Sequence, residues 1–115
     1  MHLGLIGGIG PAATELYYRG LVQAHETATQ PLELTLVQAD LRELVRNMTE
    51  HAAERQTQAF LRLARRLYAA GAEVVAITSI AGHFCLREFE RVSPLPIIRG
   101  VAAFGRVDSG VISVA

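Results

Sequence analysis

The sequence predicts an α/β domain built on a doubly wound parallel sheet, with helices on both faces of the strands. Short apolar runs typical of strands alternate along the chain with longer segments of helical periodicity. The run at 73–78 is almost continuously apolar, which is typical of a parallel strand covered on both faces. With 115 residues, 50% of them hydrophobic, the chain is large enough for one core.

The first predicted strand comprises residues 2–6, and a glycine cluster separates it from the first helix. Pro11 favours a helix start, because its missing N–H would lie in the first turn, where it needs no partner. We expect that helix to reach about residue 28, and Pro31 interrupts the chain after it. Residues 32–40, rich in apolar and β-branched side chains, are predicted as the second strand.

The polar segment 41–50 fits either a loop or a short helix. From about His51 to Ala70, an apolar stripe at helical spacing predicts a long helix, and Gly71 is a natural end for it. The stripe consists of Phe60, Leu63, Ala64 and Leu67. Four arginines at other positions are expected to form a solvent-exposed face: Arg55, Arg62, Arg65 and Arg66.

The remaining elements complete the alternation of strands and helices. The apolar strand at 73–78 is expected to lie in the centre of the sheet. A third helix is predicted over 81–92, a short fourth strand over 95–98, and a fifth strand over 110–115. The sequence contains no internal repeat and no linker, so we expect a single domain over residues 1–115.

The composition excludes several classes of function. All eleven basic residues are arginine, which excludes a lysine Schiff base to pyridoxal phosphate and a Walker lysine on a triphosphate. The formal net charge is zero and no basic block occurs, so neither nucleic acid nor a membrane is an expected partner. The apolar runs are too short to span a bilayer, and no charged leader precedes the first strand, so we expect a cytoplasmic protein.

The glycine loop after the first strand is a candidate ligand site. Unpaired N–H groups at a helix start attract anions, so Gly8 and Gly10 are candidates for binding a carboxylate or a phosphate, with the Thr14 hydroxyl facing the same opening. Gly8, Gly10 and Ala13 also fit the dinucleotide fingerprint G-x-G-x-x-[GA]. Asp40 lies 32 residues after Gly8, too far for the acidic residue which that fingerprint places about 20 residues on. A turn that binds nothing is the third alternative.

A second candidate site follows the predicted central strand, because ligands of open parallel sheets bind outside the carboxyl ends of the strands. Ser79 and His83 lie four residues apart there, and a hydroxyl beside an imidazole can transfer a proton. The alternatives are a helix-capping serine and a packed histidine. Cys85, the single cysteine, is expected to be buried packing. His51 and Glu54 could suggest a metal site, but a carboxylate at a helix start is explained by the helix dipole, so no metal site is expected.

Four motifs, in this order, resemble the N-terminal half of the aspartate/glutamate racemase family. They are GLIGGIGPAATELYYR, the strand ending in QAD, the segment AAGAEVVAITS and the following AGH, and they lie within residues 3–98. The resemblance implies a Rossmann-like three-layer α/β/α domain that is one half of a two-domain enzyme without a cofactor. It also implies a reaction in which two acid–base groups act on opposite faces of the α-carbon of an acidic amino acid.

The resemblance implies roles for residues of this sequence. Ser79 occupies the proton-transfer position, which is usually a cysteine in the family, and His83 supports it. The implied contacts with the substrate are a carboxylate held by Gly8, Gly10 and Thr14, and an ammonium group received by Asp40.

Three departures from the family weaken these expectations. A hydroxyl is much harder to ionise than a thiol, whose pKa is near 8.5, so Ser79 makes a poorer base. Ile80 and Ala81 replace an Asn-Thr pair that contacts the substrate carboxylate in the family. We also expect the second half, with its own catalytic cysteine, to be absent.

A homodimer that opposes two copies of Ser79 would imitate the two halves. The alternatives to a racemase are a truncated or non-catalytic carboxylate-binding remnant and a dinucleotide-binding domain.

Overall fold

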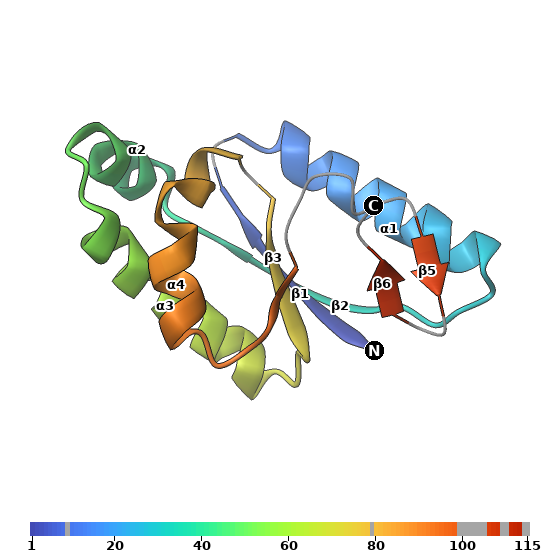
Figure 1. The fold of residues 1–115 in the computed structure, drawn as a ribbon. Helices are drawn as coiled ribbons and strands as arrows, with labels where there is room; N and C mark the ends of the chain where they lie inside the picture. Colours follow the sequence, from blue (N-terminus) through green and yellow to red (C-terminus); the bar gives the residue numbers. More distant parts are fainter. Residues whose placement is uncertain (9, 79, 99–105, 109–110, 114–115) are drawn as a thin grey trace.

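A four-stranded parallel sheet forms the centre of the protein, seen in a computed structural model that describes residues 1–8, 10–78, 80–98, 106–108 and 111–113 (Figure 1). The strand order is β2-β1-β3-β4. The strands are β1 (His2–Gly7), β2 (Glu33–Gln38), β3 (Val74–Ile77) and β4 (Ile97–Ile98). Because β1 and β3 are the two inner strands, the prediction that the apolar strand near residue 75 is central is confirmed.

The helices lie on both faces of this sheet, which confirms the doubly wound, three-layer architecture (Figure 1). One face packs against α1, and the other packs against the remaining helices. The described helices are α1 (Ala12–Thr27), α2 (Leu41–Thr49), α3 (Ala53–Ala69), the 3₁₀ helix η1 (Ile80–Cys85) and α4 (Leu86–Val92). Within the described residues, no helix has both the length and the apolar character needed to cross a membrane.

Strand β1 is buried because its side chains alternate between two hydrophobic cores. Leu3 and Leu5 point to the face covered by α1, where they pack with Tyr17. Ile6 points to the opposite face and belongs to the larger core, which includes Phe60 of α3. A central strand with apolar residues on both faces can only be stable between two layers of helices.

Helix α3 forms as the sequence predicts. All four residues of its apolar stripe are buried, and all four arginines named above are exposed. The helix ends in a Schellman motif, in which Gly71 adopts a φ of 96°. The Gly71 N–H donates to the Tyr68 carbonyl at 3.0 Å, and the Ala72 N–H donates to the Leu67 carbonyl at 2.9 Å. The carbonyl groups in the last turn of a helix have no donor within the helix, and the motif supplies donors to these two.

The segment that the sequence leaves open between loop and helix is α2. Asp40 begins it as the N-cap, with an extended backbone and with Oδ1 accepting the Glu43 N–H at 3.0 Å. Leu44 then anchors the helix, because its side chain is fully buried in the larger core. The capping side chain and one apolar anchor are sufficient to fix a short helix here.

Two expectations for the C-terminal part are wrong in detail. The helix predicted over 81–92 begins as the tighter η1 before it continues as α4. The strand predicted within 110–115 does not extend the parallel sheet, because β6 (Val111–Ser113) pairs antiparallel with β5 (Arg106–Asp108) in a separate two-stranded sheet. Only two residues separate β5 from β6 in the sequence, which is too few for the crossover that a parallel pair needs.

The aromatic contact between α3 and α4 should dominate the stability of the larger core. Phe60 and Phe89 are fully buried, with ring centroids 5.6 Å apart. We expect Phe60→Ala to lower the free energy of unfolding by about 3–5 kcal/mol, because it removes this contact and leaves a cavity. Tyr68→Ala on the same helix is the matched control, since Tyr68 is exposed, and it should change stability by less than about 0.5 kcal/mol. Urea unfolding measures both, and equal effects would contradict this core.

Candidate functional site

The carboxyl ends of β1, β2 and β3 meet at one edge of the sheet. Gly7 lies opposite Gln38 in the register, and the Ala39 N–H extends this pairing by donating to the Gly7 carbonyl at 2.8 Å. On the other side of β1, the Thr78 N–H donates to the Ile6 carbonyl at 3.1 Å. Ligands of open parallel sheets bind at this edge. We refer to the following residues as the carboxyl-edge site: Gly7, Gly8, Thr14, Gln38 and Thr78.

Two buried threonine hydroxyls link the first turn of α1 to the end of β3. Thr14 Oγ1 lies 2.8 Å from Thr78 Oγ1, and the two residues are only 8% and 3% exposed. Thr78 Oγ1 also donates to the Ile6 carbonyl at 3.4 Å. Since Thr78 directly precedes Ser79 in the sequence, this contact fixes the backbone at the point where the predicted proton-transfer segment begins.

Gln38 ties the glycine loop to the end of β2. Its Nε2 donates to the Gly8 carbonyl at 2.8 Å and to the Ala39 carbonyl at 3.0 Å. Both N–H groups of the amide are therefore used within the protein. Sequence reasoning missed Gln38, although a polar residue at the end of an apolar strand beside a glycine loop was a usable signal.

Gly7 allows these polar groups to come together. A Cβ atom at this position would lie 2.4 Å from Gln38 Oε1 and 3.2 Å from Thr14 Oγ1. Any side chain at Gly7 must therefore displace at least one of them. The close approach, rather than the shape of the backbone, requires glycine here.

The loop between β1 and α1 leaves the start of the helix open. Gly10 adopts a φ of 70°, a left-handed conformation that glycine reaches without strain. Pro11 is the N-cap residue, and among the described residues no side chain caps α1, so the first-turn N–H groups lack the side-chain acceptor that most helices have. An anion at this position would meet both these groups and the positive end of the helix dipole.

The structure brings some of the predicted site residues together and separates others. Gly8 and Thr14 belong to the carboxyl-edge site, and Gly10 leads from it into α1. His83 Nε2 lies 3.3 Å from the Ile77 carbonyl, so the half-buried imidazole is turned back against the end of β3. Asp40 is exposed at the start of α2, and its Oδ1 is used as the cap. Ser79 lies outside the described residues.

Two further residues named from the sequence are core residues. Tyr17 of the YYR motif is buried against β1, and burial raises its pKa, whereas Tyr18 is 55% exposed on α1. Cys85 is fully buried, which confirms that it packs in the core. Burial raises the pKa of its thiol to about 11, although a hydrogen bond with Thr57 acts in the opposite direction. The thiol is therefore protonated at neutral pH, and no nucleophile is available there.

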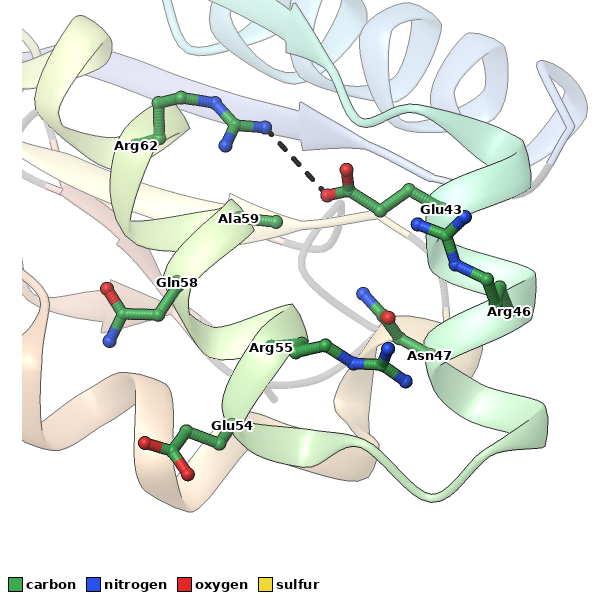
Figure 2. Close-up of a pocket in the computed structure, with 8 residues that line it drawn as sticks. All are labelled: Glu43, Arg46, Asn47, Glu54, Arg55, Gln58, Ala59 and Arg62. Carbon is green, nitrogen blue, oxygen red and sulfur yellow. Dashed lines mark ion pairs between the residues drawn. The ribbon is translucent and has the colours of Figure 1, made fainter.

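Away from the carboxyl-edge site, a cavity of about 390 Å³ lies between α2 and α3 (Figure 2). Its rim carries opposite charges, with Arg62 paired to Glu43 at 3.8 Å. Asn47 is buried at its base and donates from Nδ2 to Gln56 Oε1 at 2.9 Å, while no described residue pairs with its Oδ1. The arginines and glutamates around the cavity nearly balance in charge, which fits a solvent-exposed face and gives no preference for an anion.

The described parts of the chain contain no group of three or more His, Cys, Asp or Glu side chains that could hold a metal ion. The chemistry available at the carboxyl-edge site is instead that of hydroxyls, an amide and backbone N–H groups. Groups of these kinds are able to bind and orient a small anion through hydrogen bonds.

Neither a family model nor a curated protein matches this sequence. Two solved structures match its fold. A candidate Asp/Glu racemase from Yersinia pestis superposes with a TM-score of 0.76 and 28% identity, over 84% of this chain and 44% of that one. An aspartate racemase homologue from Pyrococcus horikoshii OT3 superposes with a TM-score of 0.73 and 23% identity, over 84% of this chain and 43% of that one.

The resemblance to the Asp/Glu racemases is confirmed. The chain spans less than half the length of both racemase structures that it matches. Its four-stranded parallel sheet with helices on both faces is consistent with one half of a two-domain racemase.

The contact between Gly7 and Gln38 can be tested by a double-mutant cycle. Gly7→Ala should displace Gln38 and lower the free energy of unfolding by about 1–3 kcal/mol. Because Gln38→Ala removes the same contact, the double variant should be little less stable than Gln38→Ala alone. Gln23→Ala, on the exposed side of α1, should be additive with Gly7→Ala. Thermal and urea unfolding measure these effects, and full additivity of the first pair would show that the two residues do not meet.

The buried thiol should make stability depend on alkaline pH. Because the pKa of Cys85 is raised from 9.0 to about 11 in the fold, the folded protein keeps a proton that the unfolded chain releases. This contribution is complete below pH 9 and is lost as the pH rises to about 11. The free energy of unfolding should therefore fall more steeply over this range in the wild type than in Cys85→Ala. Parallel curves would contradict the prediction.

Proposed function

We propose that this chain is the racemase-type half-site of an enzyme that transfers the α-proton of an acidic amino acid without a cofactor. The observation that carries the proposal is the uncapped start of α1 beside the buried Thr14–Thr78 pair. It combines hydrogen-bond donors with a positive helix end at the sheet edge where ligands bind. The racemase fold of the chain supports the reaction class.

In this proposal the substrate carboxylate binds at the glycine loop. The backbone around Gly8 and Gly10 and the hydroxyl of Thr14 provide the contacts. Asp40, which follows β2 by two residues, is the acceptor that the sequence predicts for the ammonium group. Donors aimed at the carboxylate also favour loss of the α-proton, because the negative charge that develops in the transition state spreads onto the carboxylate oxygens.

Ser79 is the proposed proton-transfer group, with His83 as its support. The position of His83 against the end of β3 supports this pairing, since Ser79 follows that strand after Thr78. An imidazole can take the proton that makes a hydroxyl a useful base. Inversion further requires a second group on the opposite face of the α-carbon. A second copy of this chain, related by a two-fold axis, would place its own Ser79 there.

A binding protein without turnover is the second candidate. The observation that favours it is the chemistry of the segment after β3, where Ser79 replaces the thiol and Ile80 and Ala81 supply no polar side chain. Such a protein would use the same carboxyl-edge site and would lack only the proton transfer.

Solvent exchange separates these candidates. The chain is incubated with aspartate or glutamate in D₂O, and the loss of the α-¹H signal is followed by NMR. We expect slow exchange that Ser79→Ala abolishes and that the exposed control Thr27→Ala leaves unchanged. Binding without exchange would identify the binding protein, whereas the absence of both would contradict the proposed function. Saturable binding of NAD or NADP in a parallel titration would instead favour a dinucleotide-binding domain.

A further inference from the structure

We infer that the side-chain carbonyl of Gln38 receives the ammonium group of the ligand and makes the carboxyl-edge site select amino acids over the corresponding acids without an amino group. The inference rests on the proposed function, because it names the class of ligand for the same site.

The orientation of the Gln38 amide follows from chemistry. Nε2 faces two carbonyl oxygens, those of Gly8 and Ala39, at 2.8 and 3.0 Å. If the amide were reversed, three oxygen acceptors would face one another without a proton between them. Oε1 therefore lies on the side of the amide away from these two carbonyls. It is an oriented acceptor, and Gln38 is an exposed residue.

The position of Oε1 is equally well defined. Gln38 Oε1 and Thr14 Oγ1 lie 2.4 and 3.2 Å from the point where a Gly7 Cβ would be. Because both oxygens are this close to one point, they lie less than about 6 Å from each other, and a single ammonium group beside Gly7 can contact both at N–H···O distances of about 2.7–3.2 Å. A side chain at Gly7 would displace these oxygens.

The covalent structure of an amino acid favours Gln38 over more distant acceptors. An α-carboxylate and an α-ammonium group are attached to the same carbon, so the groups that bind them must be close neighbours. Gln38 is hydrogen-bonded to the glycine loop itself, which is the proposed carboxylate position. Asp40, in contrast, uses Oδ1 to cap α2 through the Glu43 N–H. Only the Asp40 Oδ2 is then left for a ligand, and among the described residues no hydrogen bond joins Asp40 to the glycine loop.

The test compares ligands that differ only in the amino group. Isothermal titration calorimetry measures the Kd values of L-aspartate and succinate, and of L-glutamate and glutarate. The wild type should prefer each amino acid, and Gln38→Met should reduce this preference about tenfold to a hundredfold, the range for a hydrogen bond to a charged group. Any disturbance of the glycine loop by Gln38→Met weakens both members of a pair, so the ratio of the Kd values isolates the lost acceptor.

Two further variants distinguish the role of Gln38 from a general effect of the substitution and from a role of Asp40. Gln23→Met makes the same substitution on the exposed side of α1 and should leave the ratio unchanged. If Asp40→Asn abolishes the preference while Gln38→Met retains it, the inference is overturned in favour of Asp40. Equal affinity of the wild type for both members of each pair would overturn the inference alone. If none of the four acids binds, the proposed function and the inference both fail.

Discussion

The parallel pairing of β1 between β2 and β3 is the constraint on which the rest of the structure depends. Parallel strands place all their carboxyl ends at one edge, so the ends of β2 and β3, which are far apart in the sequence, each lie within hydrogen-bonding distance of the end of β1. The two cores hold this arrangement by burying the side chains of β1 on both faces. A shift of β1 by one residue would move each of its side chains to the opposite face, so the two cores together fix this register.

Polar contacts then convert this edge into a shaped site. The Thr14–Thr78 hydroxyl pair joins α1 to β3, and Gln38 joins the glycine loop to β2. Each of these contacts passes close to Gly7, where a Cβ atom would not fit. The same hydrogen bonds therefore stabilise the edge and orient the groups that would meet a ligand, which is how a small domain can hold a site without a metal or a disulfide among the described residues.

The polar side chains of the carboxyl-edge site are neutral, since they are two threonine hydroxyls and one glutamine amide. In the proposed function, these hydroxyls, the amide and the helix N–H groups bind a zwitterionic acid through oriented dipoles. The single thiol of the chain, that of Cys85, is not part of the carboxyl-edge site, because it is buried in the larger core, where its pKa is raised. In the proposed function, a racemase fold is combined with the Ser79 hydroxyl at the position where the resemblance to the family implies a thiol, and the reaction would depend on how well neighbouring groups assist that hydroxyl.

The sequence by itself determined the fold class, the alternation of strands and helices along the chain up to residue 98, the central place of the strand near residue 75 and the buried stripe of α3, because local periodicity and glycine or proline punctuation report directly on local structure. It also indicated Thr14 and the glycine loop, since a helix start is a local feature. Only the tertiary structure decided that Gln38 and Thr78 join this edge and that β6 pairs with β5, because these contacts depend on strand register and on partners distant in the chain. No local pattern of residues encodes that proximity.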